Sequence, residues 1–330
     1  MYKNKTILIT GGTGSLGKAI TKHIFENFKD IKKLIIFSRD EQKQFKMSQE
    51  YPINKYPKIR FFIGDVRDKE RLNRAFRGVD YVIHAAAMKH VHIAEYNPDE
   101  CVKTNINGAQ NVISASIDAG VSRVVALSTD KACSPINLYG ATKLTSDKLF
   151  IAANNIKGEN PVRFSVVRYG NVMGSNGSVI PFFQKTAKTG YIPITDPEMT
   201  RFNITILEGV ELVLFTLENA FGGELFVPKI PSYKITDVAK AIDPDCEIKI
   251  IGIRPGEKLH EEMISSSDSF TTYDVGDKYI ILPNQFIHLN NFLALYKPKK
   301  VDENFSYKSN ENEFWENVDS LKSKINSLIV

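Results

Sequence analysis

The chain has 330 residues, more than one hydrophobic core usually serves, so we expect a large domain with a smaller appended lobe. Its 42% hydrophobic and 25% charged residues, with 20 glycines and 14 prolines, are typical of a globular protein and exclude a disordered or collagen-like chain. The net charge is +5, but basic residues are scattered among acidic ones, so no nucleic-acid partner is expected.

The first 170 residues alternate short β-branched apolar runs with amphipathic stretches, which indicates βαβ units around a parallel sheet. The apolar runs are mostly continuous, as a sheet covered on both faces requires. Strands are expected at 6–10, 33–38, 59–64, 81–86, 123–129 and 164–169, and helices at 15–28 and 98–119. The predicted fold class is therefore α/β, a doubly wound parallel sheet of the Rossmann type.

After residue 170 the pattern changes and the loops lengthen. Helices are expected at 179–189 and 205–220, and strands within GELFVPK and EIKIIGI. We assign residues 1–170 to a dinucleotide-binding domain, with returning segments near 203–230. Residues 171–330 are assigned mainly to a smaller α/β substrate-binding lobe and a C-terminal tail. From about residue 265 the chain is rich in Ser, Asp, Asn and Lys, and its pattern predicts little.

The turn after the first strand reads TGGTGSLG and opens a helix. Glycines here allow a tight turn, let the backbone approach a pyrophosphate and let the helix pack on the strand. The amino terminus of the helix then faces the phosphates. The residues expected to bind a dinucleotide are Gly11, Thr13, Gly14, Ser15, Leu16 and Gly17.

The second strand ends in Ser38, Arg39 and Asp40, about 20 residues beyond the glycines. A basic residue here would contact the 2′-phosphate of NADP, whereas an acid would hydrogen-bond the ribose of NAD. Arg39 favours NADP; the alternative is that Arg39 is a solvated charge and Asp40 serves the ribose. Further cofactor contacts are expected from Asp65, Val66 and Ala85.

Tyr139 and Lys143 form a YxxxK pair one helical turn apart, so both side chains reach one face of a helix. That spacing is common by chance, but this helix follows the fifth strand, at the carboxyl edge where doubly wound sheets bind ligands. An ammonium group near a phenol favours the phenolate, which indicates a catalytic pair.

Thr129, Asp130 and Lys131 end the fifth strand and are expected to face the same crevice. An acid and an amine beside a tyrosine base can transfer protons, with a loop ion pair as the alternative interpretation. A lysine acts as a base at neutral pH only if desolvation or a nearby positive charge lowers its pKa.

These residues resemble the extended short-chain dehydrogenase/reductase family, whose motifs TGGTGSLG, YGATK and RYGNVMG occur in order. More narrowly, STDKACSPINLYGATKL, AAAMKHVHIAEYNP, RYGNVMGSNGSVIPFF and IGIRPGEKLHE are similar to the inverting UDP-N-acetylglucosamine 4,6-dehydratases that begin pseudaminic acid synthesis. The resemblance covers nearly the whole chain to about residue 264. Related dehydratases have Thr-Asp-Glu where this chain has an amine at Lys131, and membrane-anchored retaining relatives have methionine in place of Tyr139.

The resemblance implies a redox-neutral hydro-lyase with bound NADP⁺. Hydride would leave carbon 4 of the sugar while Tyr139, supported by Lys143, removes the hydroxyl proton. Lys131 would then take the carbon 5 proton, Asp130 would protonate the departing carbon 6 hydroxyl, and hydride would return to carbon 6. Thr129 would hydrogen-bond the sugar oxygen. Inversion follows if carbon 5 is reprotonated from the opposite face.

The resemblance also implies further binding residues. Lys89, Thr104 and Asn105 would help to hold cofactor or sugar. The substrate-binding residues it implies are Lys89, Asn171, Val179, Ile180, Pro181, Phe182, Phe183, Arg201 and Arg254. Arginines suit a UDP group because a guanidinium binds phosphate bidentately, although Arg254 could instead pair with Glu257. The expected partners are a small UDP-sugar and further copies of the chain in a homo-oligomer.

Metal, disulfide and membrane features are not expected. The three cysteines are odd in number and far apart, which predicts a reducing, cytoplasmic location. His84, His90 and His92 lack a carboxylate at ligand spacing, so no metal is expected. No apolar run approaches the roughly 18 residues of a spanning helix, and we expect no signal peptide.

Two rival functions are a nucleotide-sugar 4-epimerase or reductase with the same tyrosine and cofactor, and a dinucleotide-sensing protein that has lost catalysis. Asp130 and Lys131 argue against an epimerase, which catalyses no elimination. The complete set with Tyr139 and Lys143 argues against a non-catalytic sensor.

Overall fold

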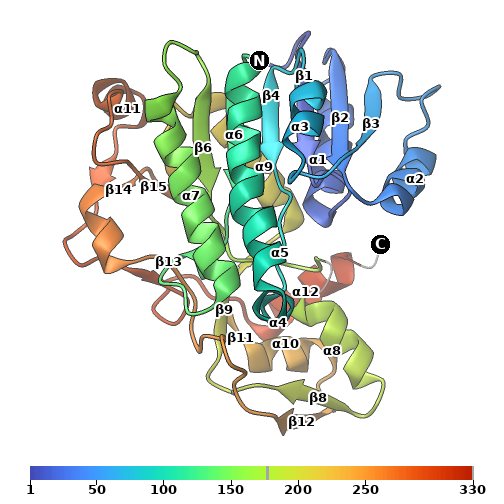
Figure 1. Ribbon diagram of the computed structural model, residues 1–330. Coiled ribbons are helices and arrows are strands. Elements are labelled where there is room, and N and C mark those ends of the chain that lie inside the picture. The colour runs from blue at the N-terminus through green and yellow to red at the C-terminus, as the bar shows by residue number, and fades with distance from the viewer. Residues whose placement is uncertain (176–177, 329–330) are drawn as a thin grey trace.

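The first six strands form one side of a large twisted sheet, from its edge strand inward, in a computed structural model that describes residues 1–175 and 178–328 (Figure 1). They are β1 (Thr6–Thr10), β2 (Lys33–Ser38), β3 (Ile59–Ile63), β4 (Tyr81–His84), β5 (Arg123–Leu127) and β6 (Arg163–Val167). All pair in parallel in the order β3-β2-β1-β4-β5-β6. The order reverses between β1 and β4, as in a doubly wound sheet, so the predicted fold class is confirmed.

Helices cover both faces of this sheet. They are α1 (Ser15–Asn27), α2 (Glu41–Glu50), α3 (Lys69–Ala75), α4 (Val91–Tyr96), α5 (Pro98–Val102), α6 (Gly108–Asp118), α7 (Leu138–Ile156) and α9 (Ile206–Asn219). On one face α6 packs between α3 and α7, and on the other α1 packs against α9. The helix predicted at 98–119 is interrupted by a π-helical turn, η1 (Lys103–Asn107), a distortion that occurs frequently at functional sites.

Residues beyond 170 return to the same sheet. Strand β10 (Leu225–Pro228) pairs in parallel with β6, and β15 (Lys278–Ile281), β14 (Thr272–Asp274) and β16 (Lys299–Lys300) follow in antiparallel order. The sheet therefore draws on residues beyond both 170 and 230, while the domain boundary at 170 stays a prediction. The segment after residue 265, predicted as a tail, is integral structure; its strands are too short for an apolar pattern to mark them.

A smaller lobe lies below the carboxyl edge of the sheet (Figure 1). Its elements are β7 (Asn171–Val172), α8 (Val179–Ala187), β8 (Tyr191–Ile194), β9 (Thr200–Ile204), β11 (Ser232–Lys234), α10 (Ile235–Ile242), β12 (Glu247–Ile250) and α12 (Val318–Ser327). The lobe has its own hydrophobic core, which includes Ile180, Phe183 and Val238 together with Leu321 from α12.

The remaining elements join the lobe to the sheet. They are η2 (Asp130–Ala132), β13 (Glu262–Ile264), η3 (Ser266–Thr271), α11 (Leu289–Tyr296) and β17 (Tyr307–Lys308). Asn176 and Gly177 of the predicted substrate motif lie outside the described residues. Among the residues that are described, no helix combines the length and the apolar character needed to cross a membrane.

Candidate active site

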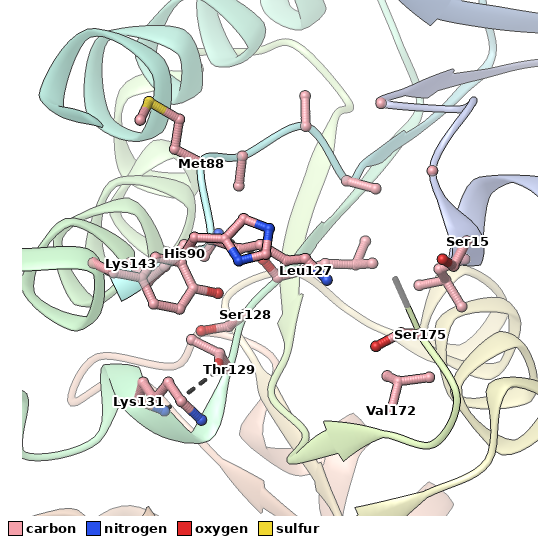
Figure 2. Close-up of a pocket in the computed structure, with 18 of the residues that line it drawn as sticks. Ser15, Met88, His90, Leu127, Ser128, Thr129, Lys131, Lys143, Val172 and Ser175 are labelled. Carbon is pink, nitrogen blue, oxygen red and sulfur yellow. Dashed lines mark hydrogen bonds between the residues drawn. The ribbon is translucent and has the colours of Figure 1, made fainter. Parts of the chain in front are cut away.

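A cavity of about 960 Å³ lies between the carboxyl ends of the strands and the lobe, which is where doubly wound sheets bind ligands. Figure 2 shows Thr129, Lys131 and Lys143 on one side of it and Ser15, Val172 and Ser175 across from them. The predicted site residues on its wall are Gly11, Thr13, Gly14, Ser15, Leu16, Gly17, Ser38, Arg39, Asp65, Val66, Ala85, Lys89, Thr104, Thr129, Lys131, Tyr139, Lys143, Asn171, Val179 and Arg201. The fold thus brings both predicted sets to one cavity.

The glycine turn leaves the amino terminus of α1 open to the cavity. Gly11 has φ +66°, and a Cβ there would lie 2.8 Å from the Ala86 nitrogen, so only glycine fits. Gly14 is the N-cap of α1 and has no side chain with which to cap the helix, and the first turn contains no acidic residue. The positive end of a helix suits an anion, so the residues present fit a dinucleotide pyrophosphate.

Arg39 and Asp40 are held very differently at the end of β2. The Asp40 carboxylate caps α2 and accepts a hydrogen bond from the Lys43 nitrogen at 2.9 Å. Arg39 is 60% exposed, and its nearest ion-pair partner is Asp65 at 3.8 Å, an oxygen that Arg67 binds at 2.7 Å. Because Asp40 is engaged by its own helix and Arg39 is only loosely paired, this geometry favours the 2′-phosphate interpretation.

Tyr139 and Lys143 both come from the first turns of α7, whose N-cap Asn137 accepts a hydrogen bond from the Gly140 nitrogen at 2.8 Å. Tyr139 is 8% exposed, and burial raises its pKa to about 12, although the charge of Lys131 and a hydrogen bond with Thr129 partly oppose the rise. Lys143 is buried, which lowers its pKa, and its Nζ donates to the Leu127 carbonyl oxygen at 2.6 Å. Both groups border the cavity, and Figure 2 shows Lys143 on its wall.

Lys131 is held by three oxygen atoms. Its Nζ lies 3.0 Å from Asp130 Oδ1, 3.1 Å from Glu261 Oε1 and 3.4 Å from Asn171 Oδ1. Asp130 is 0% exposed and is not on the cavity wall, whereas Thr129 and Lys131 are. The expectation that Asp130 faces the crevice is therefore wrong: Asp130 opens the 3-10 turn η2 (Asp130–Ala132), and its carboxylate is buried behind the wall, where it accepts hydrogen bonds from the cavity-facing Thr129 hydroxyl and Lys131 Nζ.

The sequence-based hypothesis requires that the pKa of Lys131 be lowered, so that its amine can act as a base; the surroundings of Lys131 have the opposite effect. Burial alone would lower the pKa of Lys131, but the carboxylates of Asp130 and Glu261 raise it above its usual value. Burial raises the pKa of Asp130 despite the attraction of Lys131. Lys131 is thus an ammonium ion in this structure, and a base at this position needs a route for losing its proton.

The comparisons with known proteins place the chain in a family. The family model described as polysaccharide biosynthesis protein matches residues 7–283. The chain belongs to this polysaccharide biosynthesis protein family. The resemblance to the extended short-chain dehydrogenases/reductases is confirmed as well.

Three known proteins are similar to most of the chain. UDP-N-acetylglucosamine 4,6-dehydratase (inverting) of Campylobacter jejuni is 57% identical, over 99% of this chain and 98% of the relative. UDP-glucose 4-epimerase of Rickettsia canadensis is 44% identical, over 85% of this chain and 84% of the relative. The X-ray structure of Pen from Bacillus thuringiensis has 37% identity and a TM-score of 0.89, and covers 100% of this chain and 99% of that one.

Glu261 is a site residue of this family member that the sequence analysis missed. It is the last residue of the IGIRPGEKLHE motif, is 2% exposed, and borders the cavity. Its Oε1 lies 3.1 Å from Lys131 Nζ and 3.6 Å from Arg201 Nε. The motif therefore contained a signal for it, but a glutamate beside a second glutamate normally indicates a solvated surface, and no role was assigned to it.

Several predicted site residues do not line the cavity. They are Asp130, Asn105, Ile180, Pro181, Phe182, Phe183 and Arg254. Ile180 and Phe183 pack instead in the core of the lobe, because the apolar face of α8 covers that core. Asn105 supports the cavity from behind, since its side chain bonds both the backbone nitrogen and the backbone oxygen of Met88 at 2.8 and 2.9 Å.

The two arginines predicted to bind UDP differ in their surroundings. Arg201 is buried, and its guanidinium donates to the backbone oxygens of Thr200, Lys258 and Leu259 at 2.7, 3.0 and 3.1 Å. Arg254 is exposed, and its NH1 lies 3.8 Å from Glu257 Oε1, which matches the ion pair considered as its alternative role. Contact of Arg254 with a nucleotide stays a prediction.

Gly140 offers a test of how tightly α7 holds the turn that carries Lys131. A Cβ at this position would lie 2.1 Å from the Lys131 carbonyl oxygen. We expect Gly140→Ala to lower the free energy of unfolding by about 1–3 kcal/mol, because backbone must move to make room. Gly209→Ala in α9 is the matched control: its nearest atom would be Leu16 Cδ1 at 3.6 Å, so it should stabilise by about 0.5–1 kcal/mol. Urea unfolding measures both, and equal effects would contradict the prediction.

Proposed function

We propose that this chain is an inverting, NADP-dependent UDP-N-acetylglucosamine 4,6-dehydratase that acts at the start of pseudaminic acid synthesis. One observation carries the proposal: Tyr139, Lys143 and Lys131 share a cavity with the glycine turn. The similarity to the dehydratase of Campylobacter jejuni over the full chain supports the substrate class. The amine at Lys131, beside two carboxylates, distinguishes elimination from epimerisation because an epimerase needs no such group.

The dinucleotide would be held by the turn from Gly11 to Gly17, with Arg39 at its 2′-phosphate. When bound, NADP⁺ supplies a hydride acceptor at carbon 4 and later a hydride donor at carbon 6. The chain's own residues then only move protons. Tyr139 takes the proton of the carbon 4 hydroxyl, and its hydrogen bond with the Thr129 hydroxyl stabilises the phenolate.

Elimination uses the groups around Lys131. The new ketone at carbon 4 acidifies carbon 5, and Lys131, the member of the cluster with an amine at the cavity wall, takes that proton. Asp130 lies behind it and cannot touch the sugar directly. Its Oδ1 is 2.9 Å from the Thr129 hydroxyl, and Thr129 does line the cavity, so we assign to that hydroxyl the transfer of a proton from Asp130 to the departing carbon 6 hydroxyl.

The deciding experiment is to incubate the purified protein with UDP-N-acetylglucosamine and NADP⁺. We expect a product lighter by one water molecule, with a methyl doublet in its proton NMR spectrum and no accumulation of NADPH. An isomer of unchanged mass would instead indicate a 4-epimerase, the function named for the relative from Rickettsia canadensis. Stoichiometric NADPH would indicate a dehydrogenase.

Cofactor choice is tested by Arg39→Ala. Removal of a charge-assisted phosphate contact should weaken NADP⁺ binding by roughly tenfold, a modest value because the side chain is exposed to solvent, and should leave NAD⁺ binding within twofold. Lys18→Ala is the control, since Lys18 is paired with Glu50 at 2.7 Å and is not on the cavity wall. Equal losses for both dinucleotides in calorimetric titration would contradict the assignment. The cytoplasmic location and the homo-oligomeric state stay predictions.

A further inference from the structure

Two buried carboxylates flank Lys131, and each has one oxygen without a partner. Asp130 Oδ2 and Glu261 Oε2 are buried and make no hydrogen bond within the described residues. Asp130 already has a role as the acid in the proposed elimination. Glu261 has none, although it contacts both Lys131 and Arg201.

The backbone of Glu261 is fixed by two hydrogen bonds with Ser309. Its nitrogen donates to Ser309 Oγ at 2.9 Å, and its carbonyl oxygen accepts from the Ser309 nitrogen at 2.8 Å. Ser309 Oγ in turn lies 2.7 Å from Thr200 Oγ1, next to Arg201 on β9. The carboxylate is therefore fixed between the amine and the arginine by a segment that follows residue 300.

The charged and titratable groups that face this cluster come from five elements or loops. They are Asp130 and Lys131 of η2, Tyr139 of α7, Arg201 of β9, Tyr233 of β11 and Lys258 of the preceding loop. Burial opposes ionisation of Glu261, but the charges of Lys131, Arg201 and Lys258 outweigh it and hold its pKa below the usual value. Glu261 is thus an ionised carboxylate whose proton affinity depends on how many cations remain beside it.

We propose, on the basis of the proposed function, that Glu261 is the positioning residue that receives the ammonium proton of Lys131 when the nucleotide diphosphate binds at Arg201. A bound diphosphate offsets the charge of Arg201, so Glu261 loses part of what keeps it ionised. The N–H bond at Lys131 Nζ then breaks and an O–H bond forms at Glu261 Oε1, across the 3.1 Å contact. Lys131 becomes a neutral amine only when substrate is present.

The proton balance is simple. The carbon 5 C–H bond breaks, its electron pair stays on the sugar as the enolate of the carbon 4 ketone, and its proton goes to Lys131 Nζ. The ammonium is restored, and Glu261 releases its proton when the nucleotide leaves. Asp130 keeps its own proton for the carbon 6 hydroxyl. No oxidant or further reactant is needed.

The test is Glu261→Gln, with carbon 5 deuterium exchange and NADPH absorbance followed in heavy water with UDP-N-acetylglucosamine. We expect carbon 4 oxidation to stay within threefold of wild type and exchange at neutral pH to fall about 100-fold. Exchange per molecule of oxidised sugar should then rise about tenfold per pH unit in the variant, because solvent must remove the Lys131 proton, and should be independent of pH in wild type. Glu261→Asp should recover part of the rate, and Glu262→Gln, whose carboxylate accepts from Ser134 at 2.8 Å, should match wild type.

Three results would overturn the inference. Unchanged exchange in Glu261→Gln would remove the role, and an equal loss at every pH would show that Glu261 only orients Lys131. A third test uses the wild-type protein with ¹⁵N-lysine: UDP alone should move the Lys131 Nζ resonance, assigned with Lys131→Met, toward that of an amine, and no movement would refute the coupling. If wild type shows neither NADPH nor exchange, the proposed function fails and this inference fails with it.

Discussion

Tyr139→Phe should lower the rate of carbon 4 oxidation by about 10³-fold, within the 10²–10⁴ range of a positioned base. The phenol is buried in the cavity, where the charge of Lys131 and a hydrogen bond with Thr129 lower its pKa against the larger effect of burial. Because a pKa of about 12 lies far above neutrality, the wild-type rate should also rise with pH. Single-turnover NADPH absorbance measures both effects.

Tyr169→Phe is the matched control for this substitution. Tyr169 is also a buried tyrosine on the cavity wall whose pKa is raised by burial, but the proposed mechanism gives its hydroxyl no task. We expect less than a threefold change in carbon 4 oxidation. Equal losses in the two variants would show that the cavity needs its hydroxyls in general and would withdraw the role of base from Tyr139.

Lys131→Met should separate the two halves of the reaction. The methionine keeps much of the side-chain stem but carries no amine. Carbon 4 oxidation should fall by at most about tenfold, because the hydrogen bond between Thr129 and Tyr139 remains, while carbon 5 deuterium exchange falls by about 10²–10⁴. Lys43→Met is the control, because Lys43 also lies on the cavity wall, pairs with Asp40 at 3.3 Å and does not belong to the charged cluster around Lys131. Normal exchange in Lys131→Met would leave Glu261 or water as the base.

The same variant should lose stability in a pH-dependent way. Removing the ammonium takes from the buried Glu261 carboxylate the nearer of its two ion-pair partners and leaves only Arg201 at 3.6 Å, which costs about 3 kcal/mol at neutral pH. In wild type the lowered pKa of Glu261 contributes stability above its unfolded value, and this contribution is lost as the pH falls. The difference between variant and wild type should therefore shrink in acid, where Glu261 is protonated. Urea unfolding at neutral and acidic pH measures it.

Local patterns were sufficient to predict the parallel sheet and the cofactor side of the cavity. Continuous apolar runs such as 6–10 and 33–38 are buried on both faces, and burial of that kind leaves a signal in each strand separately. The glycine turn and the YxxxK pair could also be predicted, because backbone geometry and helical spacing restrict which residue types occur at nearby positions in the chain. Strands β14, β15 and β16 were not, since short antiparallel strands at a sheet edge carry no such run.

The protonation chemistry of the site, in contrast, was decided by tertiary structure. Asp130 and Lys131 are adjacent in the sequence, so their proximity could be predicted. The direction of each side chain depends on the turn between β5 and α7 and on the packing of Gly140 against that turn. Glu261 reaches Lys131 only because Ser309, from the segment predicted to be a tail, fixes its backbone. Apolar periodicity and motif spacing were sufficient to predict the fold class and the position of the cavity, because burial and local backbone geometry constrain the residue types within each segment. The charge on the amine depends on carboxylates brought beside it from distant segments, and no local pattern records such contacts.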